Sequence, residues 1–205
     1  MRVALDLLTR LWRRAAAGDV APLETLMTSG FVAVDVAATG PEAGRDEIIA
    51  IAAVTFAEGR VGPGLVTFVR PAAVIPGLDA VAAAAPPIGK VVPRMDALCA
   101  RRIVVHHDAA FDLAILARAR GPRISMAPRL VLDTQRLARA LGFEATGLDA
   151  LADRLRVLDS GRPGVERNAR MAGEILLALL PELRRQGVGT MRDALELQRR
   201  ASATA

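Results

Sequence analysis

Three positions place an acidic or amide side chain at the boundary of a predicted strand or helix. Asp35 closes an apolar run that begins at Phe31. Asp112 follows a short apolar run ending in His106, and Asn168 opens a strongly apolar helical segment. A buried carboxylate is costly unless a metal ion or hydrogen bonds compensate its charge. Because divalent cations such as Mg²⁺ prefer oxygen ligands, these residues indicate a candidate site with metal or acid–base chemistry.

The elements that must position these residues follow from hydrophobic periodicity. We expect strands over 31–36, 48–56, 64–69, 103–106 and 130–133, and helices over 90–100, 109–118, 134–141, 148–155, 168–180 and 190–200. Three closely spaced strands predict an antiparallel meander, and the later strands alternate with helices. The sequence therefore predicts an α/β fold with a mixed central sheet and flanking helices.

We divide the chain into an N-terminal helical extension (1–29), a central domain (30–183) and a C-terminal helix with its tail (184–205). Within the extension, residues 3–17 predict an amphipathic helix with an arginine-rich polar face. The simpler interpretation is that this helix packs against the rest of the protein and exposes its arginine face to solvent. Binding to a partner is the alternative.

Composition limits the possible functions of the 205-residue chain. Its net charge is +5, but Lys90 is the single lysine and alanine and arginine are abundant, so basicity permits phosphate binding without establishing it. The single cysteine, Cys99, excludes an internal disulfide and a cysteine-based zinc cluster, and we expect a buried thiol. No apolar run approaches the ~18 residues that span a bilayer, and the N-terminus lacks a signal-peptide pattern. We therefore expect a cytoplasmic protein that does not bind membranes.

Four segments in order resemble the DEDD-type 3′–5′ exonucleases, specifically relatives of the proofreading epsilon subunit of bacterial DNA polymerase III. The family reads Asp-x-Glu-Thr-Thr-Gly where this chain has Asp35-Val-Ala-Ala-Thr-Gly40, and His-Asn-Ala-x-Phe-Asp where it has His107-Asp-Ala-Ala-Phe-Asp112. An Asp-Thr junction matches Asp133-Thr134, and His-x-x-x-x-Asp-Ala falls on Pro163–Ala169. The resemblance covers about Phe31–Leu180 and implies a ribonuclease H-like fold.

The resemblance also implies which residues the site has lost. Family members hold two divalent cations with four carboxylates and use a histidine as general base. Here the glutamate position is Ala37, the histidine position is Pro163 and the last aspartate position is Asn168. Of the five groups, Asp35 and Asp112 remain. We therefore expect no cofactor, or in the alternative one weakly bound Mg²⁺ or Mn²⁺ on Asp35, Asp112 and Asn168.

Neighbouring residues have structural and functional interpretations. By the resemblance, Thr39, Gly40, His107 and Phe111 line the cleft and contact nucleic acid. Further cleft positions of the family fall on Ala50 and on Pro76-Gly-Leu78.

Other polar residues near these motifs have simpler explanations. Asp108 and Asp133 are best explained as helix caps. His106 and His107, adjacent on a strand, should point to opposite faces and not share a metal. Glu166 would reach the site only if the helix began as late as residue 168.

The main hypothesis is a degenerate exonuclease domain that has lost catalysis and binds nucleic acid or a protein, the latter through the helix over 3–17 or 190–200. The alternative is a weak metal-dependent 3′–5′ exonuclease that releases nucleotides from single-stranded DNA or RNA ends. A third interpretation is an α/β domain with an unspecified binding role.

Overall fold

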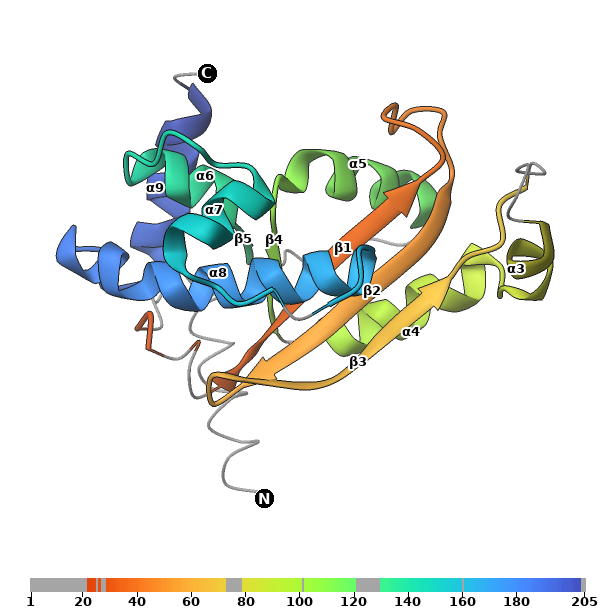
Figure 1. Cartoon of the computed structure of the whole chain (residues 1–205), viewed down its shortest axis with the longest axis horizontal. Helices are drawn as coiled ribbons and strands as arrows, with labels where there is room; N and C mark the ends of the chain where they lie inside the picture. The colour runs from red at the N-terminus through yellow and green to blue at the C-terminus, as the bar shows by residue number, and fades with distance from the viewer. Residues whose placement is uncertain are drawn as a thin grey trace.

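The computed structural model describes residues 22–24, 26, 29–72, 79–100, 102–120, 130–159 and 161–203. The predicted basic helix over 3–17 and the segment 76–78 lie outside these residues. The strands are β1 (Phe31–Ala38), β2 (Ile48–Ala57), β3 (Arg60–Phe68), β4 (Ile103–His106) and β5 (Val131–Asp133). They form one five-stranded sheet with the order β3-β2-β1-β4-β5 (Figure 1).

The sheet confirms the predicted mixed topology. β1, β2 and β3 pair antiparallel as a meander, whereas β4 pairs parallel with β1 and β5 parallel with β4. β3 begins at Arg60, four residues earlier than predicted, and so includes Pro63 between two glycines. These residues are tolerated because β3 lies at the edge of the sheet, where one side of the strand needs no hydrogen-bond partner.

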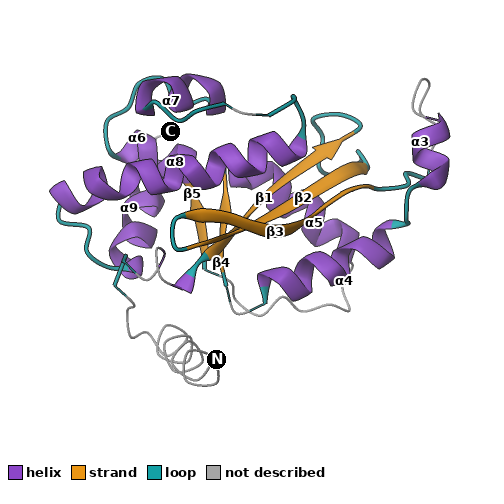
Figure 2. Cartoon of the chain, turned by 60° about the horizontal axis from the view of Figure 1, so that its bottom comes forward, coloured by secondary structure: helices purple, strands orange, loops and turns teal. Residues whose placement is uncertain are grey.

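Helices cover both faces of the sheet (Figure 2). They are α3 (Asp79–Ala84), α4 (Ile88–Cys99), α5 (Ala109–Arg120), α6 (Thr134–Ala140), α7 (Leu148–Leu155), α8 (Val165–Arg185) and α9 (Met191–Ala203). The long helix α8 lies across one face, against β1 and β2, and α4 and α5 pack on the other. The predicted buried thiol is confirmed, because Cys99 belongs to the core cluster on the α4 and α5 side.

Alternation along β1 decides which side chains reach each face. Phe31 and Ala33 join the core cluster that contains α8, whereas Val32 and Val34 join the cluster beneath α4 and α5. Because side chains alternate along a strand, Asp35 must lie on the α8 face of the sheet.

Helix α8 differs from its predicted range of 168–180 at both ends. It begins at Val165, directly after Pro163 and Gly164, and it continues through Pro181 to Arg185. Proline inside a helix costs a backbone hydrogen bond. Here Leu179, Leu180 and Leu183 on either side of it are buried, and such packing supplies most of the stability of a helix in a protein.

The last helix is part of the same packed unit. α9 contacts α6 and β5, and Met191 and Ala194 are buried in the core cluster around α8. Its Gln198 donates from Nε2 to the carbonyl oxygen of Val131 and accepts from the backbone N–H of Asp133, so a side chain pairs with the edge strand β5. Within the described ranges, no helix is both long and apolar enough to cross a membrane.

Candidate functional site

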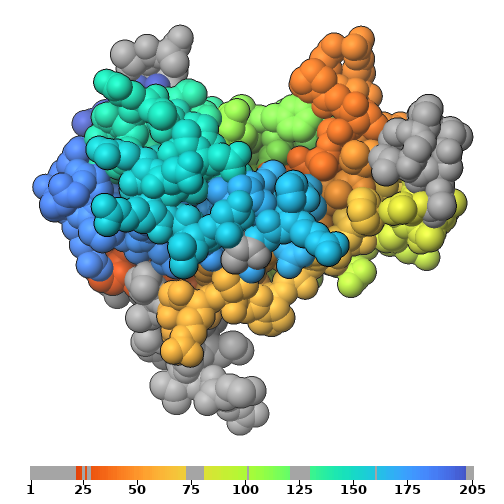
Figure 3. Space-filling view, in the orientation of Figure 1, coloured from red at the N-terminus to blue at the C-terminus, as the bar shows by residue number. Residues whose placement is uncertain are grey.

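Asp35, Asp112 and Asn168 converge from three elements. Asp35 lies on β1, Asp112 on the first turn of α5 and Asn168 near the start of α8. The amide of Asn168 donates from Nδ2 to Oδ2 of Asp35 over 3.4 Å, across a sequence separation of 133 residues. Figure 3 shows a hollow on this side of the molecule, in which α5 (green) lies between the β1–β2 loop (orange) and α7 (teal).

Burial disfavours the charged form of both carboxyl groups, Asp35 and Asp112. Burial and, to a smaller extent, the nearby charge of Asp112 raise the pKa of Asp35 from its ordinary 3.8 to about 7, although the hydrogen bond from Asn168 opposes both effects. Burial likewise raises the pKa of Asp112. A buried carboxyl group beside another acid keeps its proton to a higher pH than a free one does, unless a cation replaces that proton.

His106 is the principal partner of Asp112. Its Nδ1 lies 2.9 Å from Oδ2 of Asp112, and the histidine is only 1 % exposed. This hydrogen bond and the charge of a protonated His106 both lower the pKa of Asp112, against the larger effect of burial. The pair fixes the position of Oδ2 of Asp112. Sequence reasoning missed this role; its one signal is a histidine at the end of an otherwise apolar strand.

The start of α8 excludes one possible replacement for the missing acid. Since the helix begins at Val165, Glu166 lies in its first turn and is exposed. Residues two apart on a helix point to different sides, so Glu166 cannot join Asn168 over Asp35. The condition for Glu166 to reach the site, a helix beginning at residue 168, is therefore wrong. Pro163 is exposed in the segment just before the helix.

Arg167 forms ion pairs that connect the segment before α8 with α7. Its guanidinium pairs with the carboxylate of Asp159 at 2.6 Å and with that of Asp149 at 2.5 Å. These two ion pairs link the start of α8, the preceding loop and the first turn of α7. Sequence reasoning did not find this network, because its members are brought together only by the packing of α7 on α8.

The Thr-Gly pair after β1 shapes a loop. The hydroxyl of Thr39 donates to Asp46 and accepts from the backbone N–H of Glu47, and Asp46 also accepts from the N–H of Glu42. A Cβ on Gly40 would lie 2.7 Å from an oxygen of Asp46, so a side chain there would displace this carboxylate. Thr39 and Gly40 thus have a structural explanation that is independent of any ligand.

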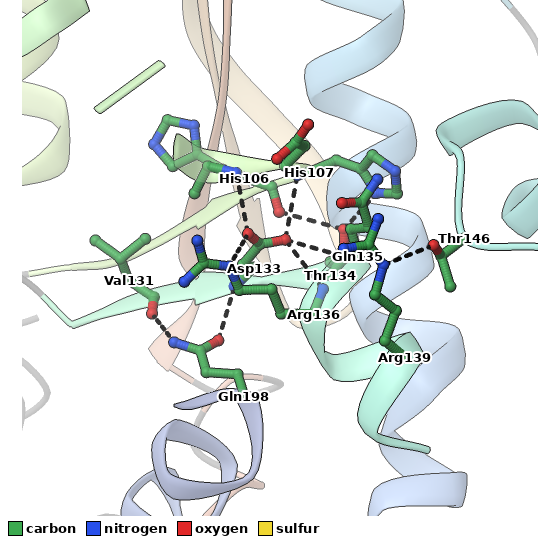
Figure 4. A network of polar contacts seen from close by, with 12 residues as sticks. His106, His107, Val131, Asp133, Thr134, Gln135, Arg136, Arg139, Thr146 and Gln198 are labelled. Carbon is green, nitrogen blue, oxygen red and sulfur yellow. Dashed lines mark hydrogen bonds and ion pairs between the residues drawn. The ribbon is translucent and has the colours of Figure 1, made fainter. Parts of the chain in front are cut away.

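Asp133 organises the loop that leads to Asp112 (Figure 4). It caps α6 by accepting from the N–H groups of Gln135 and Arg136, as predicted. It also accepts from the N–H groups of Asp108 and Ala109, at the start of α5. Asp108 itself has φ of 58°, far from the extended conformation of an N-cap residue, so Asp133 takes the role predicted for Asp108.

His107 and Phe111, the other predicted cleft residues, both make contacts inside the protein. Nδ1 of His107 lies 2.8 Å from the hydroxyl of Thr134, in the network of Figure 4. Burial lowers the pKa of His107, and the charge of Asp133 opposes that effect. The ring of Phe111 is partly buried against the core cluster under α4 and α5. His106 and His107 have different partners, Asp112 and Thr134.

Comparisons with known proteins bear on the fold of the chain and on its relatives in sequence. The chain is 34% identical over 184 residues to a DNA polymerase III subunit epsilon-like protein of Rhodobacter capsulatus, an alignment that covers 82% of the chain. It is 27% identical over 176 residues to the PolC-type DNA polymerase III of Caldanaerobacter subterraneus, covering 80% of the chain. No protein-family model matches. The sequence is thus similar to part of two proteins that are named after bacterial DNA polymerase III.

Solved structures give the same fold. Exonuclease X in complex with 5′ overhanging duplex DNA superposes with a TM-score of 0.57 at 20% identity, covering 82% of this chain and 99% of that one. The Mg²⁺- and Mn²⁺-bound form of Pop2p from S. pombe gives a TM-score of 0.61 at 11% identity, covering 84% and 89%. At these identities the likeness establishes the fold. The chain thus has the fold of the DEDD exonucleases and resembles the epsilon-like relative in sequence.

This chain corresponds to a small part of each of these two relatives. The alignments cover 26% of the Rhodobacter protein and 12% of the Caldanaerobacter protein. Similarity alone therefore does not assign the activities of those longer proteins to this chain.

The donor groups of this epsilon-like site fit a two-metal centre poorly. Over the described ranges, no group of three or more His, Cys, Asp and Glu side chains is placed to hold a metal ion. Asp112 already accepts from His106, and Asn168 turns the N–H side of its amide, not its oxygen, toward Asp35. Two closely spaced divalent cations need several anionic oxygen ligands. Asp35 and Asp112 supply two.

Proposed function

We propose that this epsilon-like domain binds the 3′ end of a single-stranded nucleic acid without efficient hydrolysis. One observation carries the proposal: at the site, Asp35 faces an amide N–H of Asn168 where a further carboxylate would be needed for a second cation. A neutral donor beside Asp35 reduces negative charge in the site, and a phosphate group approaches such a site at lower electrostatic cost.

The remaining family positions support the same conclusion. Ala37 has no side-chain donor or acceptor, and Pro163 cannot accept a proton from water. Loss of a general base alone costs about 10²–10⁴-fold in rate. Loss of two of four anionic metal ligands adds to this cost, since two-metal catalysis relies on both ions. Named neighbours in the fold, such as Exonuclease X, are bound to DNA, which favours nucleic acid as the ligand class.

A weak metal-dependent 3′–5′ exonuclease is the second candidate. The specific observation in its favour is that the charge of Asp112 raises the pKa of Asp35, an effect that a single Mg²⁺ or Mn²⁺ between the two would relieve. Residues Asp35 and Asp112, with Asn168 if its amide were turned around, would hold that ion. Thr39, Gly40, His107 and Phe111 stay proposed nucleic-acid contacts, and a protein partner through residues 3–17 or 190–200 stays a prediction.

A nuclease assay separates the two candidates. A 5′-labelled single-stranded oligonucleotide is incubated with excess protein and Mg²⁺ or Mn²⁺, using the wild type, Asp35→Ala and the combined variant Ala37→Glu, Pro163→His, Asn168→Asp. We expect no Asp35-dependent release of nucleotides from the wild type and measurable release from the combined variant. Single reversions should do little, because groups that act as a unit are strongly non-additive. Metal-dependent release by the wild type that Asp35→Ala abolishes would establish the exonuclease instead.

Binding is measured separately. In fluorescence anisotropy without divalent cations, the wild type should bind a single-stranded oligonucleotide, and binding should weaken with salt. Failure to bind any single-stranded DNA or RNA would refute the proposed ligand class.

A further inference from the structure

Two exposed apolar side chains lie in line with the candidate site. Among the described residues, Phe68 is 54 % exposed and Val66 is 48 % exposed, both on the edge strand β3. The register of the sheet connects them to β1. Asp35 pairs with Ala52, which pairs with Val66, and Ala37 pairs with Ala50, which pairs with Phe68. Residues directly opposite each other in antiparallel strands point to the same face.

That face is the one that carries the candidate site. Ala52 belongs to the core cluster around α8, whereas Leu65 and Val69, which alternate with Val66 and Phe68, belong to the cluster under α4 and α5. Val66 and Phe68 therefore share the face of Asp35 and Ala37, but α8 leaves them at the surface. Figure 3 shows β3 (gold) at the surface alongside α8 (blue).

Small side chains separate these residues from the site. In each row the central residue is an alanine, Ala50 or Ala52, so no large side chain of β2 stands between β1 and β3. Neighbouring strands lie about 4.8 Å apart, which puts β3 about 10 Å from β1. Stacked nucleotides rise about 3.4 Å each, so this distance corresponds to about three nucleotides.

We propose that Phe68, flanked by Val66, is a stacking platform for a base within the first three nucleotides of a single strand whose 3′ end lies at Asp35 and Asn168. This inference rests on the proposed function and adds to it the part of the ligand that is bound. An aromatic ring accepts any base by stacking, so the platform holds nucleic acid without reading its sequence.

The edge position of β3 offers an alternative occupant, an added strand from a second copy of the chain. The ligand we propose is favoured because the first half of β3 contains Pro63 between Gly62 and Gly64 and pairs with β2 through an irregularity between Val54 and Phe56. Only Leu65–Phe68 remains as a regular edge, which is short for strand addition. The exposed ring of Phe68 and the methyl groups of Val66 also project from the face of the sheet, whereas an added strand would bind along its edge.

The test compares Phe68→Ala with a matched control in anisotropy titrations of the full chain. The probe is a 5′-labelled single strand of about 12 nucleotides, at fixed salt and without divalent cations. Phe68→Ala should weaken binding by about 5- to 150-fold, the range found for loss of one base–aromatic stack, and Phe68→Trp should retain it. Val61→Ala, which removes a 47 % exposed apolar side chain near the other end of β3, should leave affinity unchanged.

Probes with one abasic site identify the contact. An abasic site at one of the three 3′-terminal positions should weaken binding to the wild type but not to Phe68→Ala. If the wild type binds and Phe68→Ala binds equally well, the platform is refuted while the proposed function stands. If the wild type does not bind, the proposed function itself fails. If Phe68→Ala changes the molar mass of the protein in analytical ultracentrifugation but not its affinity for the oligonucleotide, β3 is an interface between copies and the inference is overturned.

Discussion

Replacing Asp35 by asparagine should make the protein more stable, although it removes the most distinctive acid of the site. The pKa of Asp35 is raised to about 7 by burial and by Asp112, against 3.8 for the ordinary side chain. The unfolded chain therefore ionises this group at lower pH than the folded chain does. For an acid with a raised pKa, stability is lost as pH rises from the unfolded pKa to the folded one.

The magnitude follows from this difference. At roughly 1.4 kcal/mol for each pKa unit, ionised Asp35 costs up to about 4 kcal/mol above pH 7, and about 3 kcal/mol of this is lost between pH 5 and pH 8. Partial access of solvent to the carboxylate lowers the observed value, so we expect Asp35→Asn to gain about 1–3 kcal/mol between these two pH values. The cost of burying the new amide is the same at both and does not enter the difference.

Urea denaturation of the wild type and the variant at the two pH values measures this gain, provided the slopes with urea stay equal. Asp153→Asn, which changes an exposed aspartate on α7, is the matched control and should show no such pH-dependent gain. If Asp35→Asn is no more stable than the wild type at pH 8, or gains equally at both pH values, Asp35 is not held beside an uncompensated charge and the electrostatic account of the site is wrong.

Two further substitutions test what supports the site. Asp133→Ala leaves backbone N–H groups at the starts of α5 and α6 without their acceptor and should lower the free energy of unfolding by about 2–4 kcal/mol, with a smaller loss for Asp133→Asn, as measured by chemical denaturation. Gly173→Ala would put a Cβ 2.3 Å from the ring of Phe56, so it should cost about 1–3 kcal/mol; adding Phe56→Leu should recover part of this loss in a double-mutant cycle, and simple additivity would contradict the contact.

The positions of the strands along the chain and the faces of their side chains were predictable because they depend on local periodicity. Alternation along β1 places Asp35 on the other face of the sheet from the valines of the same strand. The apolar runs that lead to His106 and Asp133 end where β4 and β5 end. The ranges of α8 were less predictable. Its continuation past Pro181 depends on burial of the surrounding leucines, a contribution that local propensity does not contain.

The order of the motifs in the sequence was enough to predict the fold and to locate the site positions. It also showed that acids are missing at Ala37 and Asn168. Side-chain type is local information, so a missing carboxylate is visible without a structure. Only the tertiary structure decided how the remaining groups are paired. These pairs depend on which elements pack together. They are His106 with Asp112, Arg167 with Asp149 and Asp159, and Asn168 with Asp35. The same holds for Phe68, whose place beside the site comes from strand register and is invisible in the local sequence.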